Sequence, residues 1–166
     1  MNRIVAFVLT ALFSLSCYSL TAHKPVILHD IYGASFPFSS LNGKWVFINY
    51  WASWCHPCRN EIPELNRFYN INKKDTVALF AVNYDGLPNE KQTKLARQFG
   101  IQYPSLSQDP ALDLDLGEIQ VLPVTFVFNP KGQLNDVLYG AQTMEGLNAY
   151  LQKNTQQALD SQQWIS

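Results

Sequence analysis

Cysteine and charge are both scarce in this chain. Only three of its 166 residues are cysteine, and 15% are charged, with 12 Lys and Arg against 13 Asp and Glu and a formal net charge of −1. Three cysteines are too few for a scaffold held together by disulfides, so any function of cysteine is local. The balanced charge excludes the basic surface of a nucleic-acid-binding protein, and we expect no nucleic-acid partner.

Apolar and aromatic residues, in contrast, are plentiful. They make up 47% of the chain and include 10 Phe, 8 Tyr and 4 Trp. This composition excludes a mainly disordered chain, and the length is typical of one domain.

Residues 1–22 have the pattern of a secretory signal peptide. A positive start at Asn2-Arg3 precedes the nearly continuous apolar run Ile4–Leu15, as in signals with an apolar stretch of about 7–15 residues. The run is too short for a membrane-spanning helix of about 20 residues. Cleavage after Ala22 would release a soluble protein, whereas cleavage before Cys17 would leave a lipid anchor there. Either route predicts a periplasmic or other extracytoplasmic location, where disulfides persist.

Residues 23–153 are expected to form one α/β domain, followed by a Gln-rich tail (154–166) that extends the last helix. Continuous apolar runs or alternation predict strands, and helical spacing with Gly or Thr at the ends predicts helices. The expected strands are 45–51, 76–82, 101–106, 124–128 and 133–139, the expected helices are 56–69, 89–99 and one from 143, and 24–44 should hold short strands or a hairpin. This order predicts a mixed sheet with helices on both faces.

The segment Trp54-Cys55-His56-Pro57-Cys58 lies where the first long strand ends and a helix begins. A helix amino terminus offers free N–H groups and a positive dipole end, which stabilise a thiolate. We therefore expect an exposed Cys55 with a lowered pKa, tuned by its neighbours Trp54, His56 and Pro57. Cys58 follows nearly one turn later, within reach of a disulfide with Cys55.

A zinc site and a pair of inert thiols are the alternative interpretations of these cysteines. Zinc needs further ligands, but no Cys or His follows Cys58, and His23 and His29 are not spaced as a ligand pair. Inert thiols seldom occupy a Cys-x-x-Cys segment at a helix start. We therefore predict a redox-active dithiol without a bound metal.

Glu61 and Pro123 are two further candidate residues. Glu61 follows Cys58 by three positions on the same helix face, where a buried carboxylate could accept the Cys58 proton; a solvated Glu paired with Arg59 or Arg67 is the alternative. Pro123 opens a strand, which a cis Leu122–Pro123 bond or a trans proline in an edge turn would allow. A cis-proline loop would leave the Leu122 backbone free to pair with an extended substrate.

Two motifs give the chain a marked family resemblance. Residues 43–63 are similar to the pattern GK-x-V-x-x-N-F-W-A-x-W-C-x-P-C-R-x-E-x-P of the TlpA/ResA/CcmG group of exported thioredoxin-like proteins, with Tyr50 in place of Phe. Residues 122–132 are similar to the group's L-P-T-T-F-L-I-(D/N)-x-x-G, with Val124 in place of the first Thr. The resemblance implies a thioredoxin fold, here with an N-terminal strand or hairpin extension.

The same resemblance implies roles for individual residues. Cys55 would be the attacking thiol, Cys58 the resolving thiol, Glu61 the buried acid and Pro123 a cis-proline between Leu122 and Val124. No cofactor beyond the dithiol is implied. Proteins of this group usually reduce exported proteins, often the CxxCH segment of apocytochrome c, and receive electrons from a membrane donor of the DsbD/CcdA type.

Two other functions stay open on the sequence. An imidazolium at His56 would stabilise the thiolate and favour an oxidant that donates its disulfide, in the manner of DsbA. A copper-binding chaperone on the same fold would need a CxxxC spacing and a later His, and this chain has neither. The Thr-x-x-Cys arrangement of peroxiredoxins is also missing.

Overall fold

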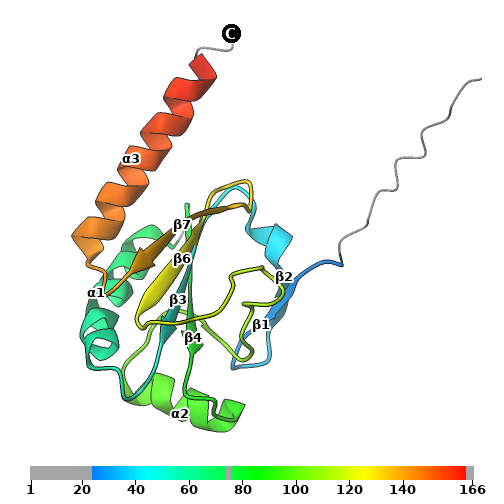
Figure 1. Cartoon of the computed structure of the whole chain (residues 1–166), viewed down its shortest axis with the longest axis vertical. Helices are drawn as coiled ribbons and strands as arrows, with labels where there is room; N and C mark the ends of the chain where they lie inside the picture. The colour runs from blue at the N-terminus through cyan, green and yellow to red at the C-terminus, as the bar shows by residue number, and fades with distance from the viewer. Residues whose placement is uncertain (1–23, 74–75, 164–166) are drawn as a thin grey trace, which may run out of the picture.

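The computed structural model describes residues 24–73 and 76–163. The expected signal peptide, with Cys17, lies outside these residues. In chain order the elements are β1 (Ile27–His29), β2 (Ser35–Pro37), the 3₁₀ helix η1 (Phe38–Leu41), β3 (Trp45–Trp51), α1 (His56–Asn72), β4 (Val77–Asn83), α2 (Asn89–Gln98), β5 (Ser105–Leu106), β6 (Val124–Phe128), β7 (Leu134–Tyr139) and α3 (Met144–Gln163) (Figure 1).

The central sheet is mixed, as the sequence predicts. Its strand order is β5-β4-β3-β6-β7, with β4 parallel to both β3 and β5, and β6 antiparallel to both β3 and β7. Strands β1 and β2 form a separate antiparallel pair, which is the expected N-terminal hairpin. All seven residues of β3 are buried because neighbouring strands flank it and side chains cover both of its faces.

Alternate residues of β3 belong to two apolar clusters, one on each face of the sheet. Trp45, Phe47 and Trp51 pack with the buried face of α1, whereas Val46, Ile48 and Tyr50 pack in the other cluster. This division follows from the two-residue period of a strand. The side chain of Asn49 falls on the face toward α1 by the same alternation.

The three α-helices all pack against one of these clusters, not on opposite faces as the sequence led us to expect. Residues of α1 belong to the cluster of Phe47 and Trp51, while Leu95 of α2 and Leu147 of α3 pack in or against it. The physical reason is the strand order: β3, β4 and β5 advance in one direction, and right-handed crossovers then place α1 and α2 on the same face. The hairpin, η1 and the 110–117 turn cover the other face.

One edge of the sheet collects the segments that the sequence analysis singled out. The parallel strands β3 and β4 end there at Trp51 and Asn83, and a four-residue turn connects β3 to α1. Val124 opens β6 opposite Tyr50, which brings the preceding Leu122–Pro123 bond to the same edge. Among the described residues, no helix is both long and apolar enough to span a membrane.

Candidate redox site

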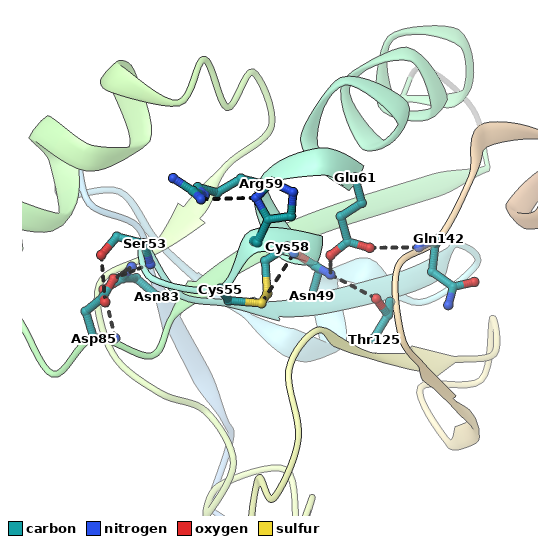
Figure 2. The surroundings of a disulfide bond; sticks show 11 residues. Asn49, Ser53, Cys55, Cys58, Arg59, Glu61, Asn83, Asp85, Thr125 and Gln142 are labelled. Carbon is teal, nitrogen blue, oxygen red and sulfur yellow. Dashed lines mark hydrogen bonds between the residues drawn. A yellow bond between two sulfur atoms is a disulfide. The ribbon is translucent and has the colours of Figure 1, made fainter.

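Cys55 and Cys58 form a disulfide at the amino terminus of α1. Cys55 is the N-cap residue, with extended backbone geometry, and its Sγ accepts a hydrogen bond from the main-chain N–H of Cys58 at 3.3 Å. The Cα atoms of the two residues are 5.3 Å apart, and their sulfurs are bonded (Figure 2). Pro57 lies in the first turn of the helix, where a missing N–H costs nothing. A thiolate at Cys55 would therefore face free helix N–H groups.

The structure corrects the expectation that Cys55 is exposed. In this disulfide form Cys55 is only 5% exposed and Cys58 is fully buried, because both side chains belong to the apolar cluster beneath α1. The preceding Trp54, in contrast, is 69% exposed. The Trp54 side chain is thus far more accessible than either sulfur atom.

His56 lies at the first helical position, and its ring contacts an arginine one turn later. Its Nδ1 is 3.3 Å from a guanidinium nitrogen of Arg59. Because a guanidinium has only donors, Nδ1 must be the acceptor in this contact. His56 and Arg59 thus lie side by side on the first turn of α1, next to Cys55.

Glu61 is buried one helical turn after Cys58, with 2% of its surface exposed. It pairs with neither Arg59 nor Arg67; Arg67 instead forms a salt bridge with Glu64. The two Glu61 oxygens accept hydrogen bonds from the Asn49 amide at 2.9 Å and from the Gln142 main-chain N–H at 2.8 Å. Burial raises the pKa of Glu61 from 4.5 to about 7, although both hydrogen bonds oppose this rise. The carboxyl can therefore gain or lose a proton near neutral pH.

The Leu122–Pro123 bond is cis, as the family resemblance implies. The Pro123 carbonyl accepts a hydrogen bond from the Gly140 N–H at 2.9 Å, which ties the loop to the end of β7. The side chain of Leu122 packs against the apolar cluster that contains both cysteines, and Val124 is buried at the start of β6. Among the described residues, none forms a backbone–backbone hydrogen bond with Leu122. The loop thus lies beside the disulfide with main-chain groups still free.

Three polar groups near Glu61 were not predicted from the sequence. Asn49 of β3 donates to Glu61 and also to Thr125 of β6, while Gln142 belongs to the segment between β7 and α3 (Figure 2). A signal existed for Asn49, because it is the one amide in the otherwise apolar and aromatic run Trp45–Trp51. No local pattern distinguishes Gln142, whose main chain makes the contact.

Asp85 holds the turn that leads into the helix. Its carboxylate accepts hydrogen bonds from the main-chain N–H and the hydroxyl of Ser53, both at 2.9 Å, and from the Asn83 amide at 2.6 Å (Figure 2). Next to it, the Tyr84 N–H donates to the Trp51 carbonyl at 2.8 Å. The end of β4 thereby fixes the main chain just before Cys55.

A groove of about 490 Å³ lies beside the cis-proline loop. Val121, Val124 and Tyr139 contribute to its lining, together with residues of β6, β7 and the 116–120 segment. Val121 and Tyr139 are exposed, at 50% and 70%. The groove is largely apolar and begins at the loop that flanks the disulfide. In the described part of the chain, no group of three or more His, Cys, Asp or Glu side chains could hold a metal ion.

A mixed sheet of this topology with a Cys-x-x-Cys disulfide at a helix amino terminus defines a thiol–disulfide oxidoreductase of the thioredoxin fold. Comparisons with known proteins agree. The model of the AhpC/TSA family matches residues 20–137. The chain is 33% identical to the thiol-disulfide oxidoreductase ResA of Geobacillus kaustophilus, over 76% of this chain and 72% of the relative, and 31% identical to ResA of Bacillus subtilis, over 75% and 69%.

A solved structure, that of StoA from Bacillus subtilis, matches with a TM-score of 0.60 at 25% identity and covers 78% of this chain and 97% of StoA. The chain belongs to the AhpC/TSA family and, within it, to the ResA-like thiol–disulfide oxidoreductases. The resemblance to the TlpA/ResA/CcmG group and the thioredoxin fold are thus confirmed.

Proposed function

We propose that this protein reduces disulfides in exported proteins through the Cys55–Cys58 dithiol. Cys55 would be the attacking thiol, Cys58 the resolving thiol and Glu61 the group that accepts the Cys58 proton. The single observation that supports this assignment best is the burial of Glu61 one turn after Cys58, with a pKa raised to about 7. A structural carboxylate has no need of a pKa near neutrality, whereas a general base works best with one.

The reaction proceeds in two exchanges, each of which forms one sulfur–sulfur bond and breaks another. The Cys55 thiolate attacks one sulfur of the substrate disulfide, and the other substrate sulfur leaves as a thiolate. Cys58 then gives its proton to Glu61, and its thiolate attacks Sγ of Cys55. The second substrate sulfur leaves, so that the substrate gains two electrons and the enzyme is left with the Cys55–Cys58 disulfide shown in Figure 2.

Substrate would bind along the cis-proline loop. The free main-chain groups of Leu122 can pair with an extended peptide. The loop is held by the pairing of Val124 with Tyr50 of β3 and by the hydrogen bond from Gly140 to Pro123. The exposed Trp54 indole would contact the same peptide. The resemblance points to the CxxCH segment of apocytochrome c as one such client, in a role in cytochrome c maturation.

The site must be returned to the dithiol after each cycle. We propose that a membrane electron donor of the DsbD/CcdA type supplies the two electrons, as in the group that the chain resembles. This scheme requires a periplasmic or other extracytoplasmic location, to which residues 1–22 would direct the chain as a signal peptide. Cys17 would carry a lipid anchor if cleavage occurs before it. Residues 23–153 would be the catalytic domain and 154–166 its C-terminal tail.

Trapping of the mixed disulfide tests the roles of the two cysteines. Cys58→Ala should accumulate a covalent complex with a peptide that carries an oxidised CxxCH segment, because Cys55 can attack but nothing resolves the product. Cys55→Ala should give no such complex. The adducts are counted by mass spectrometry of the intact protein. The reverse pattern would exchange the two roles, and adducts with neither variant would contradict dithiol chemistry.

The direction of electron flow depends on the reduction potential. A protein that donates its disulfide would have a value near that of DsbA, about −120 mV, whereas a reductant would be near thioredoxin, about −270 mV. His56 is the sequence's argument for an oxidant, whereas most proteins of the group that the chain resembles are reductants. We therefore expect equilibration with a dithiol buffer to give a value closer to −270 mV, and a value near −120 mV would overturn the proposed direction.

A further inference from the structure

Two buried polar side chains meet between β3 and α1, where the rest of the interface is apolar. Asn49 is 1% exposed and lies between Phe47 and Trp51 on the face of β3 that packs on α1. Glu61 lies among the buried residues of α1, with Ile62 and Leu65 following it. Burying an amide in such surroundings costs free energy unless it is hydrogen-bonded. The pair therefore needs an explanation beyond packing.

Asn49 uses both of its amide hydrogens to connect two strands with the helix. Its Nδ2 donates to Oε1 of Glu61 at 2.9 Å and to Oγ1 of Thr125 at 3.0 Å. Thr125 is the residue directly opposite Asn49 in the β3–β6 pairing and is fully buried. The amide plane is thus set by β6 as well as by β3. Because Oε2 of Glu61 accepts from the Gln142 N–H, the carboxyl is held at both oxygens.

We propose that Asn49 is a positioning residue for the resolving step: braced by Thr125, its amide holds the Glu61 carboxyl in the orientation and ionic form that accept the proton of Cys58. This inference rests on the role proposed for Glu61. A donor on a carboxylate favours the charged form, so Asn49 works against the burial that favours the neutral acid. Without Asn49, less of Glu61 would be ionised at neutral pH, and the resolving step would slow.

The other groups that face Glu61 do not take over this task. Cys58 precedes it on α1, and Tyr103 approaches from the segment before β5, where burial and the Glu61 charge raise the pKa of its phenol well above the ordinary value. Thr125 contributes a neutral hydroxyl from β6, and Gln142 contributes only its main chain from the β7–α3 segment. Glu64, on the next turn, binds the Met144 N–H and Arg67 instead.

The test compares Asn49→Leu with Thr125→Val in the full chain. Two profiles are recorded against pH: the infrared C=O band of the protonated Glu61 carboxyl, assigned by its loss in Glu61→Gln, and the rate at which Cys58 resolves a mixed disulfide between Cys55 and a chromogenic aromatic thiol. Loss of a hydrogen bond to a charged group should move both midpoints of Asn49→Leu upward by about one pH unit or more. Thr125→Val, which removes only the brace, should move them less but in the same direction.

Ser105→Ala is the matched control, because it removes a hydroxyl of a buried residue in the same sheet, whereas the hydrogen bonds of Glu61 come from Asn49 and Gln142. Its midpoints should equal those of the unchanged protein. Unchanged midpoints in a folded Asn49→Leu would overturn the inference, and if Asn49→Leu does not fold, an unchanged Thr125→Val would do so. A normal resolving rate in Glu61→Gln would instead overturn the proposed role of Glu61. In that case the infrared titration would still show whether Asn49 shifts the protonation midpoint of the Glu61 carboxyl.

Discussion

Two opposing electrostatic effects act on the Glu61 carboxyl. Burial favours its neutral form, while the N–H groups of Asn49 and Gln142 favour the charged form, and the pKa that results is about 7. A rise from 4.5 to 7 corresponds to about 3 kcal/mol between the two protonation states. The free energy of unfolding is therefore lower above neutral pH, because Glu61 is then ionised while buried.

The unfavourable ionisation of buried Glu61 predicts that the free energy of unfolding depends on pH. Between pH 4.5 and 7 the folded protein binds the Glu61 proton more tightly than the unfolded chain does, so the group's contribution is full below 4.5 and is lost as the pH rises through 7. Urea unfolding of the oxidised protein at pH 4.5 and pH 8 should show this loss, about 3 kcal/mol. In Glu61→Gln this part of the pH dependence should vanish.

Glu64→Gln provides the control for that measurement. Glu64 lies three residues later on α1, is 23% exposed at its side chain and bonds Arg67 and the Met144 N–H instead of the Glu61 network. It should keep the decline in stability between the two pH values. An equal decline in the free energy of unfolding from pH 4.5 to pH 8 in Glu61→Gln and in the unchanged protein would show that Glu61 titrates like an exposed carboxyl.

At the scale of elements, the end of β4 supports the turn between β3 and α1. Ser53 gives both its N–H and its hydroxyl to Asp85, and Trp51 accepts from the Tyr84 N–H. The start of α1 is thus tied to a neighbouring strand, not only to the strand that precedes it. This tie places the dithiol at the sheet edge independently of the substrate.

Removal of the tie should be measurable as a loss of stability. Asp85→Ala leaves the Ser53 N–H and the Asn83 amide without their acceptor, and we expect a decrease of about 1–3 kcal/mol in the free energy of unfolding. Asp113→Ala, which changes an exposed acidic residue away from this turn, should change it by less than about 0.5 kcal/mol. Both are read from urea titrations at constant pH, and equal values for the two variants would contradict the supporting role of Asp85.

The elements themselves follow from local patterns more readily than their arrangement does. The runs 45–51 and 124–128 each contain one polar residue and are otherwise apolar or aromatic, and they form β3 and β6 with the predicted bounds. The helix that starts at His56 was also predicted, but α1 extends to Asn72 because nothing after Tyr69 breaks it. The faces of the helices depend on strand order, which no local pattern contains, and this is why the sequence did not predict that the three α-helices share one face.

At the scale of the whole molecule, three separate stretches of chain converge on the edge of the sheet where β3 ends. The turn before α1, the cis-proline loop and the segment between β7 and α3 each contribute to the surroundings of the disulfide. The 490 Å³ groove continues from this edge along β6 and β7. A client could thus be held over a longer stretch than the two sulfurs alone.

The proposed export can be tested on the full chain in a bacterial host. Cleavage after Ala22 should give a mature protein that begins at His23, whereas lipoprotein processing should give one that begins at a lipid-modified Cys17 and partitions into detergent. Mass spectrometry of the recovered protein distinguishes the two. Cys17→Ser should leave the first product unchanged and abolish the second. Recovery of the intact chain from Met1, with reduced cysteines, would contradict export.

The sequence predicts some residues of the site more clearly than others. Cys55, Cys58 and Pro123 stand in motifs that the chain carries contiguously, so their placement could be predicted. Glu61 was ambiguous because its partners, Asn49 and Gln142, come from distant parts of the chain. The pairing of Asn49 with Thr125 depends on the register between β3 and β6, which is known only once the sheet is assembled.

The hydrogen bond from the main-chain N–H of Gln142 to Glu61 limits which substitutions residue 142 can tolerate. Because the donor is the peptide nitrogen, the identity of the side chain at this position does not affect the contact, and nineteen of the twenty amino acids supply the same N–H. Proline alone cannot. A saturation library at this codon should therefore retain function with almost any substitution and show one isolated failure.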